Sequence, residues 1–398
     1  MVTMDRFHHY MNLLFRTSIN IPIAFFVAIM VCFLAGCSFG PRMVQGNRLD
    51  YNITIQKSNN EELLLNLVRA RYAEPLFFLQ IGSISSSFGY TANAGASATF
   101  MSNLRNRASV ANLFTPSIGA GISEMPTITY SPLQGEKAVR QLQTELRLDR
   151  FLILTRIGYD IETLLWTTVT RIGDLRNIEV SVTTEKDRKP TYGEFLELAR
   201  LLFRMQRRGD LEFVGIAKGE RGTDSLTMQL RYDDEEEADK IEGLLGIRGD
   251  RTPLPDSHSS STIELTSVRD LAPPRMEEGE HVKVPIKLKS FFEMIFDLSF
   301  HVEATADELE GKIALPYRDF AGETQYRRGP HMGLIRVKSS SFCPDDAYIA
   351  VTYRNRCFYI GDNDLRSKIF LIFIGAIFSL QSGELQTAAP LLTLPVVR

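Results

Sequence analysis

Residues 88–100 read F-G-Y-T-A-N-A-G-A-S-A-T-F, and every even position from Phe88 to Phe100 is apolar or aromatic. The odd positions between them are glycine, threonine, asparagine or serine. Alternation with a period of two over this length predicts a β-strand that has one apolar and one polar face. The sequence of this stretch therefore predicts an extended strand and not a helix.

A second alternating run follows the polar connection 101–112. Its apolar positions include Phe114, Ile118 and Ile122, and small or polar residues occupy the positions between them. We expect the two runs to form a glycine-, alanine- and serine-rich amphipathic β-hairpin over 87–123.

Two interpretations of this hairpin remain open. A strand that crosses an outer membrane needs about 9–11 residues, with an apolar outer face and aromatic residues at both interfaces. Phe88 and Tyr90 at one end and Phe100 at the other bracket the first run at about that spacing. Because open edges are not tolerated in lipid, a pore would require a ring of copies. The alternative is a soluble hairpin packed on its own domain, or a mobile loop.

The N-terminus has the three-part pattern of an export signal. A basic segment with Arg6 and Arg16 precedes an apolar run from about Ile19 to Leu34. This run is shorter than the roughly 20 residues of a membrane-spanning helix, although a retained short anchor is the alternative. It ends in Leu34-Ala35-Gly36-Cys37, which closely resembles the lipobox of bacterial lipoproteins.

This resemblance implies cleavage between Gly36 and Cys37, a diacylglycerol on the Cys37 thiol and an acyl chain on the new amino terminus. Two or three acyl chains give stable anchoring. The next residue is Ser38 and not aspartate, which by resemblance to enterobacterial lipoproteins implies transfer to the outer membrane. We therefore expect membrane lipid as a partner through Cys37 and a mature chain facing the periplasm of a Gram-negative bacterium.

Length and composition restrict the remaining classes. The chain has 398 residues, 44% of them hydrophobic and 23% charged, which is typical of a globular protein and sufficient for two or three cores. A net charge of −3 does not favour a nucleic-acid partner. We therefore expect protein partners or self-association, and no nucleic acid.

Periodicity and composition predict an α+β fold: two small mixed α/β modules after a lipidated tether, with the amphipathic hairpin between tether and modules. An apolar helix over Asp364–Leu380 is expected in the core of the last module, because its apolar centre is too short to span a bilayer. The expected regions are a signal peptide (1–36), a tether (37–57), an N-terminal region with the hairpin (58–134), an α+β domain (135–246), a linker (247–261) and a C-terminal α+β domain (262–398).

Several segments resemble an uncharacterised family of Gram-negative outer-membrane lipoproteins. They are Ser58–Tyr72, Pro126–Gly135 and Tyr353–Gln381, the last containing F-Y-I-G-D-N-D-L-R-S-K. The resemblance touches both ends of the mature chain and implies export and lipidation, but no catalytic residue. The chain departs from the family at Cys357, where an aromatic residue is expected.

Cys343 and Cys357 are the cysteines that remain after processing, in a compartment that permits disulfides. They flank an expected hairpin that turns at Arg354-Asn355, which places Cys357 opposite position 352. A disulfide requires Cα atoms within about 7 Å. The two cysteines therefore meet only if the chain folds back at Pro344, and the departure from the family at Cys357 disfavours the pair.

No sequence motif for catalysis is found: the chain has no G-x-S-x-G, no phosphate loop and no H-E-x-x-H, and its histidines lack the spacing of metal ligands. No catalytic residue, metal or other cofactor is therefore expected. Our first hypothesis is a structural or scaffold subunit of a cell-envelope assembly, with an oligomeric pore formed by the hairpin as its specific version. The alternative is a monomeric, periplasm-facing binding or adaptor lipoprotein.

Overall fold

The computed structural model is a mixed α/β protein, as the α+β prediction required. Outside its described residues lie the expected signal peptide, Cys37, Phe100 and a strand expected over Ile178–Thr184. The described residues are 39–99, 113–133, 135–177, 191–218, 224–247, 251–254, 258–267, 282–318, 324–325, 334–383 and 392–395. The chain divides into two units, 1–61 and 62–398, and the boundary in the sequence falls within its first described helix.

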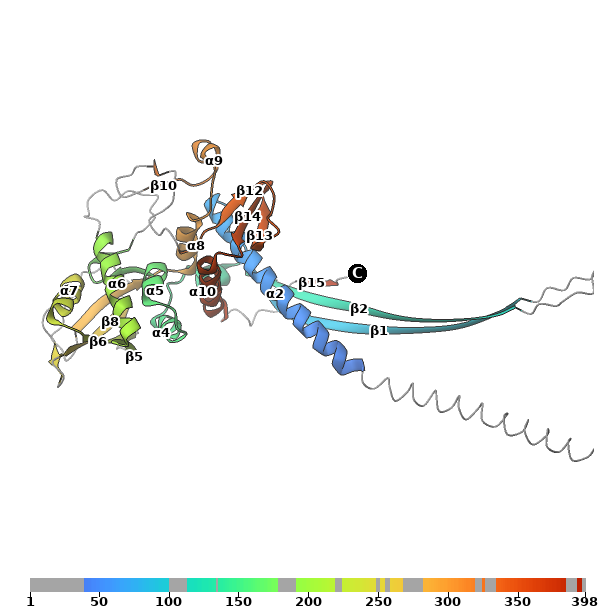
Figure 1. Cartoon of the computed structure of the whole chain (residues 1–398), viewed down its shortest axis with the longest axis horizontal. Helices are drawn as coiled ribbons and strands as arrows, with labels where there is room; N and C mark the ends of the chain where they lie inside the picture. The colour runs from blue at the N-terminus through green and yellow to red at the C-terminus, as the bar shows by residue number, and fades with distance from the viewer. Residues whose placement is uncertain are drawn as a thin grey trace, which may run out of the picture. The chain divides into compact units, whose positions relative to one another are not determined.

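The sequence predicts a helix that begins at Glu61, but the observed helix, α2 (Phe39–Arg71), begins earlier and includes most of the segment 37–57 that is expected to be the tether (Figure 1). The chain from residue 42 to 71 contains no proline, and Pro41 lies in the first turn, where the missing N–H breaks no helical hydrogen bond. Its second half buries Leu64, Leu67 and Val68, the apolar stripe that the sequence predicts.

The largest sheet has the strand order β4-β3-β9-β8-β6-β5, with β7 paired to β8. The pairs are antiparallel except β8 with β9, which is parallel. The bounds are β3 (Val169–Ile172), β4 (Leu175–Arg176), β5 (Leu211–Lys218), β6 (Asp224–Tyr232), β7 (Thr252–Pro253), β8 (Ser259–Ser267) and β9 (Val282–Leu288).

This sheet differs from the expected two-module layout. β8 begins inside the expected linker (247–261) and lies between β6 of the expected first module and β9 of the second. Strands from both modules thus belong to one sheet within the unit Glu62–Arg398. The sequence could not indicate this, because the serines at the start of β8 are typical of a loop.

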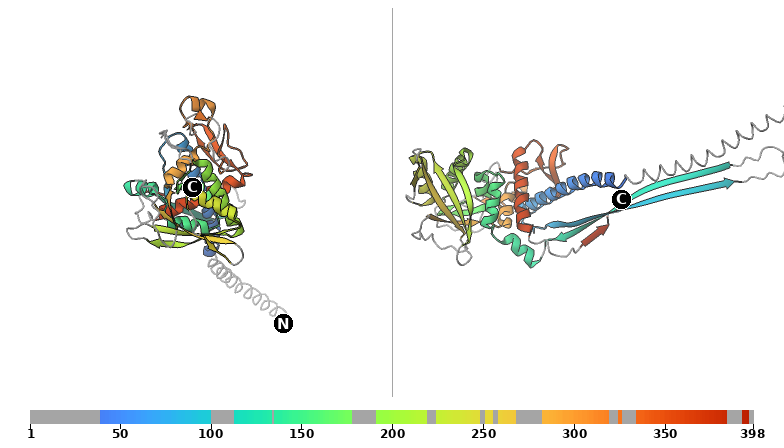
Figure 2. Two further views of the ribbon diagram at one scale, coloured as in Figure 1. Left: turned by 90° about the vertical axis from the view of Figure 1, so that its left-hand side faces the viewer. Right: turned by 90° about the horizontal axis from the view of Figure 1, so that it is seen from below.

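Helices cover one face of the sheet (Figures 1 and 2). Along β6, Leu226, Met228, Leu230 and Tyr232 are buried, while Gln229 and other positions on the opposite face are exposed. These helices contribute Phe151, Leu198 and Ile241, among others, to the core. They are α4 (Leu148–Arg156), α5 (Ile161–Thr168), α6 (Tyr192–Arg208) and α7 (Glu235–Leu245).

The last third adds a three-stranded sheet with the order β12-β14-β13 and helices around it. Among the described helices, α10 alone is long and apolar enough to cross a membrane, judged by length and composition. It buries Phe370, Phe373, Ile374 and Ile377 in the main core, as expected of a core helix. The elements of this part are α8 (Phe291–Ser299), α9 (Ala306–Glu310), β10 (Tyr317–Arg318), β11 (Thr324–Gln325), β12 (Lys338–Ser340), β13 (Ala347–Tyr353), β14 (Arg356–Gly361) and α10 (Leu365–Ser382). The earlier helix α3 (Glu136–Gln143) contacts α8 and α10.

A separate sheet contains β1 (Leu79–Thr99), β2 (Leu113–Pro132) and β15 (Leu392–Pro395). β1 and β2 pair antiparallel along almost their whole length, and we call this pair the ribbon. The apolar stretch 76–83 predicts a short strand separate from the one that begins at Phe88, but β1 is one continuous strand.

Candidate functional site: the ribbon and its root

The register of the ribbon brings the two alternating runs into phase. Tyr90 lies opposite Ile122 and Ala94 lies opposite Ile118, so even positions of β1 face even positions of β2. Residues directly opposite one another in an antiparallel pair belong to the same face. The candidate membrane positions within the described residues therefore share one face of the ribbon: 88, 90, 114, 118 and 122.

The apolar row ends about halfway along the ribbon, where Phe88 lies opposite Glu124. At the other end, Ala98 lies opposite Phe114. The positions on the second face are small or polar, for example Asn93 opposite Gly119. The backbone alone thus separates an apolar face from a polar one.

Both long edges of the ribbon are open over most of their length. β15 pairs with β2 only from Thr127 to Tyr130. Among the described strands, none pairs with β2 beyond Thr127 on that edge, and none pairs with the outer edge of β1. Open edges expose backbone N–H and C=O groups that can pair with another strand.

The root of the ribbon is fixed to α2 by two polar side chains. The buried Asn66 amide donates to the carbonyl oxygen of Phe77 at 2.8 Å and accepts from the N–H of Phe77 at 2.9 Å. One turn earlier, Glu62 Oε1 accepts a hydrogen bond from the N–H of Leu79, the first residue of β1. These two side chains therefore bond to the backbone of residues 77 and 79 in the way that the backbone of a neighbouring strand would.

Phe78, between these two anchored residues, is 2% exposed. Its ring lies 4.8 Å from that of Phe378 in α10 and 5.8 Å from that of Phe291 in α8, measured between centroids. Its carbonyl oxygen accepts from the N–H of Leu133, just after β2, at 2.9 Å. Aromatic packing in addition to hydrogen bonds holds the first residues of the ribbon in the core.

Burial at this root raises the pKa of Glu62 from 4.5 to about 7. The Leu79 N–H and the charge of Arg69 act in the opposite direction, but they do not outweigh the loss of hydration. The carboxyl group next to the start of β1 therefore titrates close to neutral pH.

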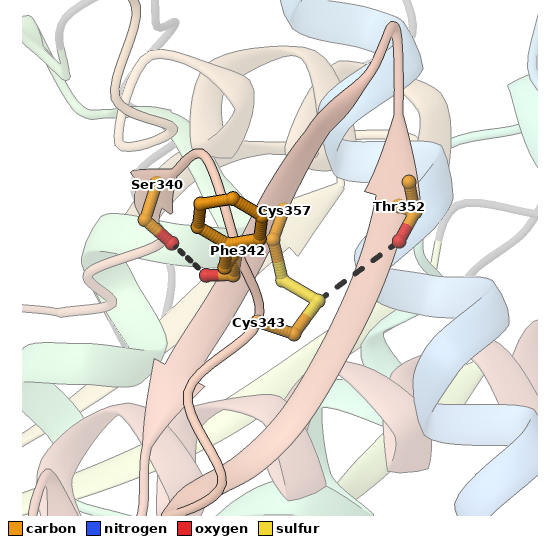
Figure 3. Close-up of a disulfide and its surroundings, with 5 residues drawn as sticks. All are labelled: Ser340, Phe342, Cys343, Thr352 and Cys357. Atoms are coloured by element: carbon orange, nitrogen blue, oxygen red, sulfur yellow. Dashed lines mark hydrogen bonds between the residues drawn. A yellow bond between two sulfur atoms is a disulfide. The ribbon is translucent and has the colours of Figure 1, made fainter.

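A disulfide joins Cys343 and Cys357, with 5.1 Å between the Cα atoms (Figure 3). Cys357 lies opposite Thr352, as the expected hairpin required. Arg354 and Asn355 form the turn with positive φ angles of 49° and 59°, which matches the twist of a tight hairpin.

The sequence predicts a strand over 333–338 in this region, whereas the observed strand β12 begins at Lys338. β12 pairs with the other edge of β14, and Ser340 lies opposite Cys357. The chain then turns at Pro344, whose carbonyl oxygen accepts from the N–H of Ala347 at 3.2 Å. The fold-back that the disulfide needed is therefore present.

Polar contacts tie this disulfide-bonded hairpin to the end of α2. Arg354 forms an ion pair with Glu74 at 2.9 Å, and its guanidinium lies 5.1 Å from the centre of the Tyr72 ring. The Tyr72 hydroxyl donates to Glu308 in α9 at 2.9 Å. The residues that connect α2 to the ribbon thus contact both the hairpin and α9.

Asn66 and Glu62 were not identified from the sequence. The available signal was an amide in an otherwise apolar stretch, L-L-L-N-L-V over 63–68. A buried polar side chain must be hydrogen-bonded, so such a residue indicates a specific partner but not which one.

Among the described residues, no group of three or more His, Cys, Asp or Glu side chains is arranged to hold a metal ion. Comparisons with protein-family models, curated proteins and solved structures found no significant match to this chain.

Proposed function

We propose that this chain is an exported lipoprotein, anchored in the outer membrane through acylated Cys37, and a structural subunit of a cell-envelope assembly. In this proposal the ribbon enters the membrane as one segment of an oligomeric pore. The observation that carries the proposal is the register, in which Tyr90 opposite Ile122 and Ala94 opposite Ile118 combine the two alternating runs into one apolar face.

The dimensions of the ribbon support a membrane role. A strand rises about 3.3 Å per residue, and about 9–11 residues cross a bilayer when tilted. β1 has 21 residues and β2 has 20. Each strand is therefore long enough to cross the membrane and to continue beyond it.

The open edges support a ring of copies. An isolated two-stranded ribbon is only marginally stable in water, and unpaired edges are not tolerated in lipid. Pairing between ribbons of several copies would satisfy both edges. The polar face, with Asn93 opposite Gly119, would then line the lumen.

Two independent features support export. The lipobox that ends at Cys37 implies processing at the membrane. Cys343 and Cys357 form a disulfide, and disulfides persist in oxidising compartments such as the periplasm.

The alternative, a monomeric adaptor that binds a partner in the periplasm, is favoured by apolar side chains outside the ribbon. Phe342, beside the disulfide, is 85% exposed. On α10, Leu365, Ile369 and Ile372 are at least half exposed and follow one another at helical spacing. An adaptor could bind its partner through either group.

Replacement of residues 88–122 by a short glycine-containing turn distinguishes the two functions. A pore subunit would lose its high-mass species after detergent extraction, but would remain acylated and disulfide-bonded. An adaptor would keep its native mass and its partner. A deletion variant that retains the wild-type high-mass species would contradict the pore.

A further inference from the structure

Every proline of β2 lies at an even position of the chain. The N–H of Leu133 donates towards β1, to the carbonyl oxygen of Phe78. Successive residues of a strand direct their backbone groups to opposite edges, and the register shift of the ribbon lies in β1 and not in β2. Odd positions of β2 therefore point to β1, and even positions point to the outer edge.

Pro116 and Pro126 both occupy even positions of β2. A proline has no N–H, so the outer edge has no donor at either position, whereas the pairing with β1 loses nothing. Between the two prolines, positions 118, 120, 122 and 124 all present backbone donors and acceptors to the outer edge. An uninterrupted edge thus extends over Ser117–Met125.

The root side of this window is already occupied by the chain itself. β15 pairs with β2 up to Thr127, which lies opposite Pro395. The next position whose backbone faces this edge is Pro126, which has no N–H to donate to another strand. A further strand can therefore join β2 only beyond Pro126, towards the end of the ribbon opposite the root.

The outer edge of β1 is complementary to this window. Two residues that lie directly opposite in an antiparallel pair behave alike: their backbone N–H and C=O groups either bond to each other or both point to the outer edges. Even positions of β1, such as Tyr90 opposite Ile122, therefore also point outward. β1 contains no proline, so its outer edge is continuous.

We propose that the β1 edge of a second copy pairs antiparallel with β2 over Ser117–Met125, and that Pro116 and Pro126 set the two ends of this ladder. The inference rests on the proposed pore function and adds its interface. The window spans nine residues, about 30 Å of strand, which matches the 9–11 residues that cross a bilayer. Because the contact joins two different edges, it is a head-to-tail contact, and its repetition forms a ring when the rotation between neighbouring copies closes.

Two proline substitutions test the interface. Ala120→Pro removes one outward donor of β2, and Ala92→Pro removes one outward donor of β1, while the ladder between β1 and β2 keeps its bonds. Ala120→Thr and Ala92→Thr are matched controls that keep the N–H. Native masses are measured on full-length, acylated protein after gentle detergent extraction, and the Cys343–Cys357 disulfide and the melting temperature serve as checks of folding.

We expect the wild type and both threonine variants to form the same high-mass species, and each proline variant alone to lose it. An equimolar mixture of the two proline variants should give a dimer, because the intact β1 edge of one variant fits the intact β2 edge of the other. A ring formed by Ala120→Pro alone, or a mixture without dimer, would overturn the interface but leave the pore standing. A monomeric wild type would overturn the pore as well.

Discussion

Asn66 and Phe77 are joined by two hydrogen bonds, one in each direction, between the side-chain amide of Asn66 and the backbone of Phe77. Asn66 lies in α2 and is fully buried, and Phe77 lies two residues before β1. This contact converts the end of a helix into the starting point of a long strand. The position of the ribbon root therefore depends on Asn66 together with Glu62 and the buried ring of Phe78.

We predict that Asn66→Leu lowers the free energy of unfolding by about 2 kcal/mol, because it leaves the partly buried N–H and C=O of Phe77 unpaired. Amide hydrogen exchange should accelerate specifically in the first residues of β1. Asn177→Leu is a matched control, since Asn177 is equally buried and bonds to the carbonyl oxygens of Trp166 and Val169. Faster exchange in β1 with both variants would contradict a specific role of Asn66.

The raised pKa of Glu62 predicts a pH dependence of stability. Its pKa is about 7 in the folded chain and 4.5 for an ordinary glutamate, so the folded state binds the proton more tightly. The stabilisation is complete below about pH 4.5 and is lost as the pH rises through about 7.

Glu62→Gln should therefore flatten the fall in melting temperature between about pH 5 and about pH 8. Glutamine retains an oxygen that can accept from the Leu79 N–H. Glu61→Gln, at the neighbouring position that pairs with Lys57 at 3.9 Å, is the control for the removal of one carboxylate from the same turn of α2. A Glu62→Gln variant with the wild-type slope would show that this carboxyl group does not titrate in that range.

Replacement of both Cys343 and Cys357 by serine should lower the free energy of unfolding by about 3 kcal/mol, since the cysteines are separated by 14 residues. Reduction of the wild type should produce a loss of similar size and should not affect the double variant. A reductant that lowers the stability of both proteins equally would indicate a cause other than this disulfide.

Cys37→Ser should abolish labelling by palmitate completely and leave an uncleaved precursor of higher mass. Cys32→Ser is the matched control, because Cys32 lies in the expected signal peptide and should be removed with it. Acylation and cleavage should be normal in this control. An acylated Cys37→Ser protein would contradict the proposed lipid attachment.

Local pattern predicted the strands of the ribbon but not where they begin. The alternation from Phe88 indicated an extended segment, and β1 includes it. β1 starts at Leu79 because Glu62 and Asn66 hold the preceding backbone. These contacts are separated in sequence by 11 and 17 residues, so periodicity within one element cannot show them.

Long-range pairing also explains why part of the expected linker (247–261) forms a strand. Ser259 and Ser260 are typical of a loop, yet they begin a strand between β6 and β9. Ser261 is buried and donates to Glu242 at 3.2 Å, and Glu242 also bonds to Arg251 at 3.0 Å. The stability of this strand depends on partners from α7 and on the chain before β8, which composition does not report.

The position of Cys343 next to Cys357 depends on β12, a strand of three residues. The hairpin that carries Cys357 was expected from its turn residues, but the sequence does not show that β12 pairs with the other edge of β14. Without β12, Cys343 could not be placed. The lipid attachment at Cys37 and the pore remain predictions from the sequence, because the relevant segments lie outside the described residues or require other copies.

The most direct test of the account is the native mass of the full-length protein after gentle detergent extraction from separated membranes. We predict a discrete high-mass species in the outer-membrane fraction, made of several copies of the acylated chain. A monomer of about 40 kDa, the size that remains after removal of the signal peptide, would contradict the self-assembled pore.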